Sequence, residues 1–246
     1  MSATLDLVSS RRRRVLMIAA NPSVSTTLGW PVGFWASELV HPWYEFTESG
    51  YEVTIASPKG GALQLDALSD PRDASGYSAH DVLSMGFLHT PALARLLEDT
   101  PAITALDAGN FDAVVVCGGQ SPMFTFPQDQ ALHLFLRRVY EAEKVTAALC
   151  HGVAALLYVT LADGTPLLRG RTVTGFANSE EDIADQLVGQ KVMPFRIEDE
   201  ARKLGANFVS RGAWKPFAVR DGRLVTGQQQ YSGREVARLV IEALGR

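Results

Sequence analysis

The apolar run Val145-Thr-Ala-Ala-Leu149 leads directly into Cys150-His151-Gly152, and the helix-like stretch Val153-Ala-Ala-Leu-Leu-Tyr158 follows. This pattern predicts a buried strand that a tight turn joins to a helix. A cysteine at such a turn is typical of a nucleophile elbow, which exposes one side chain at the carboxyl edge of a sheet. The positive end of a helix dipole would lower the pKa of the Cys150 thiol.

A plainer interpretation of the same stretch stays open. Cysteine is often a small buried hydrophobe, so Cys150 can simply complete a core strand. His151 can be an ordinary helix N-terminal residue whose ring points away from the thiol. The local spacing does not decide between these interpretations.

Apolar segments rich in β-formers alternate with helical patterns along the rest of the chain, which predicts a mostly parallel sheet with helices on both faces. The turn dipeptide Asp221-Gly222 predicts an antiparallel addition to the sheet from residues 217–219 and 224–226. The expected strands are residues 15–20, 51–57, 113–117, 145–149 and 171–174. The expected helices are residues 31–49, 128–143, 153–159 and 232–244.

Composition limits the class of protein. A chain of 246 residues with 46% hydrophobic content can bury a large core, so we expect one domain over residues 15–246 after a flexible basic tail at 1–14. The net charge of −4 provides no broad basic surface for nucleic acid. The apolar segment 15–20 is too short for a signal peptide or a membrane span, and two cysteines predict no disulfide framework. We therefore expect a cytoplasmic protein without nucleic-acid or membrane partners.

A second turn follows the expected strand 113–117. Ligands of parallel sheets bind outside the carboxyl ends of the strands. Gly118 and Gly119 permit a tight turn and a close backbone approach there, and their amides, with that of His151, form a potential oxyanion hole. Paired glycines alone are also typical of an ordinary turn, and Cys117 is expected to be a buried strand residue.

Several separate blocks carry a family resemblance in a constant order: Ser37-Glu38-Leu-Val-His41-Pro42, Ala56-Ser57-Pro58-Lys-Gly-Gly61, Asp66-Ala-Leu-Ser69, Phe111-Asp112-Ala-Val-Val-Val-Cys-Gly-Gly119, Ala148-Leu-Cys150-His151-Gly152, Thr174-Gly175-Phe-Ala-Asn178-Ser-Glu180-Glu181, Met193-Pro194-Phe195 and Asp221-Gly-Arg-Leu-Val-Thr-Gly-Gln228. On these blocks the chain resembles the ThiJ/PfpI superfamily, and within it the glyoxalase III-like and holding-chaperone branch. The resemblance implies a flavodoxin-like three-layer sandwich with a class I glutamine amidotransferase-like fold.

The resemblance also implies roles for particular residues. Cys150 corresponds to the nucleophile, His151 to its proton partner and Glu181 to the acid that orients the histidine. Glu38 corresponds to an acid that contacts the thiol, where a buried carboxyl would stay protonated. Three alternatives stay open: the register can slip by one so that Glu180 takes the place of Glu181, the two acids can be a solvated pair at a helix N-terminus, and Glu38 can be a surface residue.

No metal or cofactor is expected. His41 lies three residues after Glu38 on nearly the same helix face, but no set of ligands with diagnostic spacing accompanies them. A cysteine that adds to a carbonyl carbon needs no such group.

Departures from the family pattern affect the substrate pocket. Gln120 stands where the branch usually has His, Ser121 replaces Gly, and Gln229-Gln230-Tyr231-Ser232 replaces Asn-Pro-Ala-Ser. Most aromatic residues near these segments are expected to pack in the core. Trp30, Phe124 and Tyr231 are predicted to line an apolar pocket that suits a substrate larger than methylglyoxal.

The leading prediction is a cysteine-dependent, glyoxalase III-like enzyme that converts a 2-oxoaldehyde to a 2-hydroxy acid. Three alternatives remain: a thiol-dependent hydrolase, hydratase or carbon–carbon lyase acting on a bulkier metabolite; a holding chaperone, which needs a large exposed apolar patch; and an oxidation sensor that uses the Cys150 thiol. A homodimer is expected by analogy with the superfamily.

Overall fold

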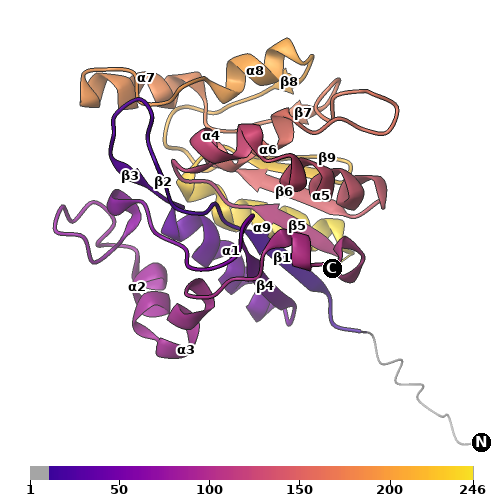
Figure 1. Ribbon diagram of the computed structural model, residues 1–246, viewed down its shortest axis with the longest axis horizontal. Coiled ribbons are helices and arrows are strands. Elements are labelled where there is room, and N and C mark those ends of the chain that lie inside the picture. Colours follow the sequence, from indigo (N-terminus) through magenta and orange to yellow (C-terminus); the bar gives the residue numbers. More distant parts are fainter. Residues whose placement is uncertain (1–10, 246) are drawn as a thin grey trace, which may run out of the picture.

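The computed structural model, which describes residues 11–245, is built around a six-stranded sheet (Figure 1). Five strands are parallel and β9 is antiparallel, which confirms the predicted mostly parallel sheet and its antiparallel addition. In spatial order the strands are β4 (Glu52–Ala56), β1 (Arg14–Ile18), β5 (Ala113–Val116), β6 (Val145–Leu149), β10 (Leu224–Gly227) and β9 (Ala218–Asp221).

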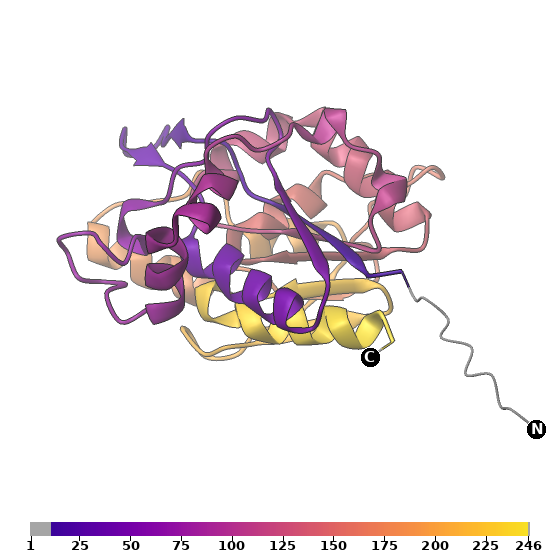
Figure 2. The same cartoon turned by 90° about the horizontal axis from the view of Figure 1, so that it is seen from below.

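Helices cover both faces of this sheet, as the flavodoxin-like prediction requires. Helices α1 (Ala36–Glu48) and α9 (Gly233–Ala243) lie side by side on one face (Figure 2). Helices α5 (Gln130–Glu141) and α6 (Ala154–Leu157) cover the other. The Asp129 side chain caps α5 by accepting a hydrogen bond from the Leu132 amide at 2.9 Å.

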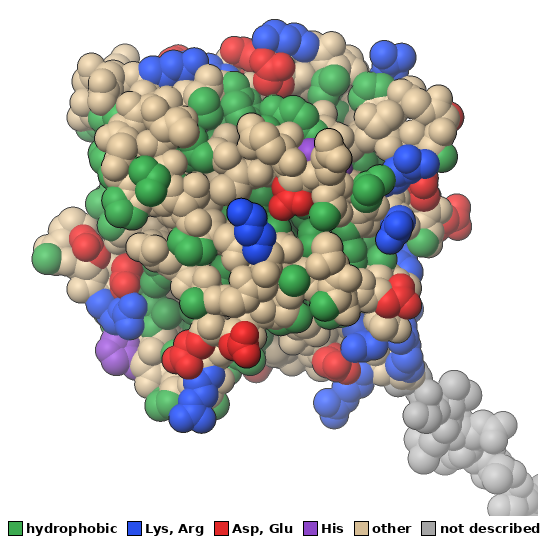
Figure 3. Space-filling model, in the orientation of Figure 1, with side chains coloured by type: hydrophobic (Ala, Val, Ile, Leu, Met, Phe, Trp, Pro, Cys, Tyr) green, Lys and Arg blue, Asp and Glu red, His purple; other side chains and the backbone are tan. Residues whose placement is uncertain are grey.

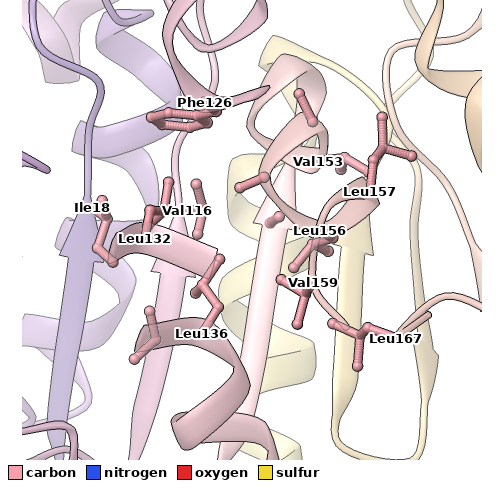
Figure 4. Packing of buried hydrophobic residues seen from close by; sticks show 14 of the residues in the cluster. Ile18, Val116, Phe126, Leu132, Leu136, Val153, Leu156, Leu157, Val159 and Leu167 are labelled. Carbon is pink, nitrogen blue, oxygen red and sulfur yellow. The ribbon is translucent and has the colours of Figure 1, made fainter. Parts of the chain in front are cut away.

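The strands pack on both sides because successive side chains point to opposite faces. On β1, Leu16 and Ile18 belong to the core under α5 and α6, whereas Val15 and Met17 belong to the core under α1 and α9. Figure 4 shows part of the first core, where Leu132 and Leu136 of α5 approach Ile18 and Val116. Burial on both faces explains the continuous apolar strands of the sequence.

Two short sheets lie outside the main one and correct two expectations. Pro31 does not start a helix: it belongs to β3 (Pro31–Val32), which pairs with β2 (Ser23–Val24). Helix α1 begins only at Ala36 because the Trp35 amide bonds instead to the Gly118 carbonyl at 3.1 Å. The expected strand 171–174 is β7 (Thr172–Val173), which leaves the main sheet and pairs with β8 (Asn207–Phe208).

The remaining helices and turns lie in the segments that connect the strands. Among them, α7 lies close to the β2–β3 hairpin in the view of Figure 1. These elements are α2 (Val82–His89), α3 (Pro91–Ala94), α4 (Pro122–Thr125), α7 (Asn178–Val188), α8 (Ile197–Lys203) and the 3₁₀ turns η1 (Ala67–Ser69), η2 (Arg95–Leu97), η3 (Ile103–Ala105), η4 (Ala108–Asn110), η5 (Phe126–Gln128), η6 (Cys150–Val153) and η7 (Gln230–Ser232).

The expected basic tail at residues 1–14 lies mostly outside the described residues. Within them, Arg11 and Arg13 bond to the Asp112 carboxylate, and Arg14 is already part of β1. On the face shown in Figure 3, basic and acidic side chains are interspersed. None of the helices in residues 11–245 is long and apolar enough to cross a bilayer.

Candidate active site

The candidate site lies at the carboxyl ends of the central strands β1, β5 and β6. The order of the central strands reverses between β1 and β5, and ligands of open parallel sheets bind beside such a reversal. Cys150 follows β6 directly and has a left-handed backbone, with φ 54°. A non-glycine residue in this conformation is strained, and such strain clusters at functional sites. This geometry is that of a nucleophile elbow.

Cys150, His151 and Glu181 form a line of hydrogen-bonding neighbours. The Cys150 Sγ atom lies 3.8 Å from His151 Nδ1, and His151 Nε2 lies 3.0 Å from Glu181 Oε1. All three side chains are buried. The first turn of α7 presents Glu181, while Phe176 packs its ring 4.2 Å from the imidazole. The arrangement holds the ring in place and can stabilise its protonated form.

The neighbouring acid, Glu180, has a different set of partners. Its Oε2 accepts the Ala177 amide at 2.9 Å, and its Oε1 accepts the Trp214 amide at 3.1 Å and the Gln228 Nε2 at 2.9 Å. Burial raises the pKa of Glu180. The alternative of a solvated acidic pair is therefore wrong, and Glu181 is the acid that faces His151.

Glu38 is fully buried beneath the thiol, so the alternative of a surface position is wrong. Its Oε2 accepts the Gly118 amide at 2.8 Å, and its carboxyl is a hydrogen-bonding neighbour of Cys150. Burial raises the pKa of Glu38 from 4.5 to about 8. The carboxyl is consequently protonated at neutral pH, as expected for a carboxyl that faces the core.

The Cys150 thiol differs from the expectation of a lowered pKa. Burial raises its pKa, the neighbouring Glu38 carboxyl raises it further, and only the hydrogen bond from the His151 amide opposes them. The helix after the elbow is short, with one 3₁₀ turn before a four-residue α6, so its dipole is small. The thiol therefore needs a proton acceptor before it can attack, and His151 is in position for that role.

The glycine turn after β5, Gly118-Gly119, packs closely against Glu38 and Trp35. A Cβ atom on Gly118 would lie 2.6 Å from Glu38 Oε2, and one on Gly119 would lie 2.5 Å from the Trp35 nitrogen. The φ of Gly119 is 108°, a left-handed value that favours glycine. Because Glu38 occupies the Gly118 amide, that amide is not available for an oxyanion. Of the two glycines, Gly119 is left as a candidate for the oxyanion hole, since it lines the cavity beside Cys150.

A cavity of about 190 Å³ opens above Cys150. Trp30 and Gln120, two of the predicted pocket residues, stand at this cavity, and the Trp30 Nε1 donates to Gln120 Oε1 at 3.2 Å. The walls are mostly apolar, which fits the expected apolar pocket. The wall residues include Trp35, Leu68, Tyr77, Phe176, Ala184, Leu187, Val188, Val192, Met193 and Trp214.

Two predicted pocket residues lie elsewhere. Phe124 is on α4, where it packs against the core and borders a depression near Asn21 and Lys59. Tyr231 borders a depression between α1 and α2, together with His41. The His41 Nε2 lies 2.8 Å from Asp81 Oδ1, and residues 11–245 contain no cluster of ligands for a metal ion.

Sequence reasoning missed Asp66, Phe176 and Trp214 as residues of the site. Asp66 is buried and joins two segments, because its oxygens accept the Gly33 amide at 2.8 Å and the Gln120 amide at 2.6 Å. Phe176 and Trp214 come from loops without periodicity. For Trp214, the available signal was a tryptophan in a loop between Gly212 and Pro216, where an aromatic side chain has no helix or strand pattern to explain it.

Comparisons with known proteins place the chain in a family and agree with its fold. The model of the DJ-1/PfpI family matches residues 30–243. The chain is 30% identical to glyoxalase 3 of Candida albicans over 87% of this chain and 91% of that protein. It is 28% identical to the glutathione-independent glyoxalase HSP31 of Saccharomyces cerevisiae over 95% and 98% of the two chains.

Solved structures show the same fold. The Rapid Encystment Protein 24 KDa of Francisella tularensis superposes with a TM-score of 0.85 at 28% identity, over 95% of this chain and 100% of that one. Glyoxalase III of Candida albicans superposes with a TM-score of 0.79 at 27% identity, over 94% and 97% of the two chains.

Proposed function

The chain belongs to the DJ-1/PfpI family, and from this premise we propose that it is an enzyme, a glutathione-independent glyoxalase that uses Cys150 as its nucleophile. Its relatives in Candida albicans and Saccharomyces cerevisiae are named glyoxalases, and the similarity covers nearly the whole length of each. The observation that carries the proposal is the line from Cys150 through His151 to Glu181, set on the floor of a cavity. The substrate is a small carbonyl compound, a 2-oxoaldehyde.

The first step is addition of the thiol to the aldehyde carbon. His151 takes the proton from Sγ, and Glu181 stabilises the imidazolium that results. The sulfur forms a bond to the aldehyde carbon, and the carbonyl oxygen becomes an alkoxide. We assign the amide of Gly119, which lines the cavity beside Cys150, to this oxygen, and the oxygen receives the proton from the ring to give a hemithioacetal.

The second step moves hydrogen between the two carbons. A base takes the proton from the former aldehyde carbon and produces an enediol, and the neighbouring carbon then accepts a proton. His151 and the neutral Glu38 carboxyl exchange these protons. The product of this isomerisation is a thioester of the 2-hydroxy acid, and no external oxidant or reductant is needed.

The last step is hydrolysis. Water attacks the thioester, the carbon–sulfur bond breaks, and the 2-hydroxy acid leaves while the thiol regains its proton. The overall reaction is addition of one water molecule to a 2-oxoaldehyde. Glutathione, metal and nucleotide have no part in it.

The direct test is conversion of methylglyoxal without glutathione. We expect the unsubstituted protein to form lactate and the Cys150→Ala variant to form none above the rate in buffer. Cys117→Ala is the matched control, because it removes the other thiol, which is sealed in the core. Lactate production that persists in Cys150→Ala would exclude the proposed mechanism.

A further inference from the structure

The chemical character of the Cys150 cavity changes between its floor and its walls. Polar groups of Cys150, His151 and Glu181 lie at the floor. The aromatic part of the wall comes from Trp30, Trp35, Phe176 and Trp214. A 2-oxoaldehyde with its reacting carbons at the floor must therefore place its substituent against an apolar wall. A methyl group would cover little of that wall and would leave its apolar surface in contact with water.

Trp214 is held in this wall by an unusual backbone conformation. Its φ of 61° lies in the left-handed region, which tryptophan rarely adopts. Its ring packs edge-on against Phe176, with centroids 5.8 Å apart, and Phe176 in turn lies 4.2 Å from the His151 ring. Strain of this kind persists only where surrounding contacts impose it.

Two buried side chains impose it. The Glu180 Oε1 accepts the Trp214 amide at 3.1 Å, and Gln228 Nε2 donates to the same oxygen at 2.9 Å. Gln228 also holds both backbone groups of Arg211: its Oε1 accepts the Arg211 amide at 2.8 Å, and its Nε2 donates to the Arg211 carbonyl at 3.1 Å. Glu180 and Gln228 have no exposed surface, and we refer to them as the Glu180–Gln228 clamp.

We infer that Trp214, positioned by the Glu180–Gln228 clamp, is a specificity-determining residue that selects 2-oxoaldehydes with an aromatic or branched apolar substituent over methylglyoxal. This inference rests on the proposed function. Aromatic rings favour edge-on and offset contacts with other rings, and a fixed indole presents such a surface without an ordering cost at binding. The Glu181–His151–Cys150 line performs the chemistry, whereas the clamp bonds to the backbone of Trp214 and positions its ring.

The experiment compares kcat/KM for phenylglyoxal with kcat/KM for methylglyoxal. We expect the unsubstituted protein to prefer phenylglyoxal and Trp214→Ala to reduce the ratio by about 10- to 100-fold, the range that apolar pocket contacts provide. Trp214→Phe should restore part of it. Tyr158→Ala removes an exposed aromatic ring outside the cavity and should leave the ratio unchanged. An unchanged ratio in Trp214→Ala would overturn the inference.

The clamp is tested by Glu180→Gln and Gln228→Ala. Loss of the clamp should release the 211–217 loop and reduce the phenylglyoxal to methylglyoxal ratio in the same direction as Trp214→Ala. A purely structural role would lower kcat for both substrates together and leave the ratio intact. That outcome would contradict the positioning role.

A binding measurement separates this inference from the proposed function. The Cys150→Ala variant, which cannot turn substrate over by the proposed route, is titrated calorimetrically with mandelate and with lactate. We expect mandelate to bind at least about tenfold more tightly, and the added Trp214→Ala substitution to remove the difference. If neither aldehyde is converted, the proposed function fails, while the mandelate preference still decides the role of Trp214. Equal binding of the two acids would refute it.

Discussion

The Glu38 Oε2 atom lies 2.8 Å from the Gly118 backbone nitrogen, so the buried acid of α1 is tied to the turn that follows β5. The two residues are 80 positions apart in the sequence. This contact places the carboxyl beside the Cys150 thiol and leaves no room for a larger residue at Gly118. Both the acid and the glycine are therefore parts of one arrangement around the sulfur.

Replacement of Gly118 by Ala should damage stability and activity together. The new methyl group would lie 2.6 Å from Glu38 Oε2, 2.8 Å from the Leu149 carbonyl oxygen and 2.9 Å from Cys150 Cβ. Overpacking of this kind costs about 1–3 kcal/mol of unfolding free energy. Gly86→Ala is the control, because nothing lies near its Cβ position in α2 and alanine favours a helix. Urea unfolding of both variants checks the prediction, and equal stabilities would contradict it.

The raised pKa of Glu38 predicts a pH-dependent cost to stability. Between pH 4.5 and about 8 the folded protein retains a proton on Glu38 that the unfolded chain releases. Stability should therefore fall as the pH rises through this window, by up to about 5 kcal/mol for the full shift. Glu38→Gln cannot titrate and lacks this component.

The measurement is urea unfolding of the unsubstituted protein and Glu38→Gln at pH 5 and pH 8.5. We expect Glu38→Gln to gain stability relative to the unsubstituted protein on going to the higher pH. Asp66, whose pKa burial raises to about 6, is present in both proteins and contributes the same trend to each. A constant difference between the two pH values would show that Glu38 titrates normally.

Glu181→Gln should slow the reaction without changing its selectivity. The amide cannot stabilise the His151 imidazolium as the carboxylate does, and loss of such support reduces kcat by about a hundredfold. Asp182→Asn, on the exposed face of α7, is the matched control and should keep its rate. Steady-state kinetics with methylglyoxal and phenylglyoxal check both points. A kcat that Glu181→Gln leaves intact would remove Glu181 from the mechanism.

Mild peroxide should oxidise Cys150 before Cys117. Cys150 borders the cavity, whereas Cys117 has no exposed surface and burial raises its thiol pKa. Peptide mass spectrometry after a short exposure would show which cysteine gains oxygen. Equal or faster oxidation of Cys117 would mean that the core opens more readily than the cavity admits peroxide.

Local patterns predicted the elbow and the main sheet. The apolar run before Cys150 and the helix after it are contiguous in sequence, so their order fixes the turn between them. The entry to α1 was mispredicted because Trp35 uses its amide on Gly118, a contact that no periodicity at residues 31–49 reveals. Proline is favoured at the start of a helix, but Pro31 instead belongs to β3, because this segment pairs with β2.

The walls of the cavity were the least predictable part of the site. Gln230 does line the cavity, but the next residue, Tyr231, borders the neighbouring depression between α1 and α2. Phe124 belongs to a short helix whose orientation depends on packing against the core. Trp214 reaches the site only because Glu180 and Gln228, 48 residues apart, meet beneath its loop.

Asp66→Asn should be strongly destabilising for an isosteric change. Each carboxylate oxygen accepts one backbone amide, from Gly33 and from Gln120, so an asparagine would turn its own NH₂ group toward one of these donors. A buried amide left without an acceptor costs about 1–3 kcal/mol of unfolding free energy. Asp70→Asn is the control, since its pair with Arg72 is partly exposed and worth about 1 kcal/mol or less.

Thermal and urea unfolding at pH 7.5 measure the difference between the two variants. Asp66→Asn should also weaken turnover, because the Gln120 amide that it releases belongs to the segment bearing Gly119 at the cavity floor. Since Asp66 is only 1% exposed, solvent has little access to replace the lost acceptor. If Asp66→Asn and Asp70→Asn unfold at the same denaturant concentration, Asp66 does not hold the two segments together.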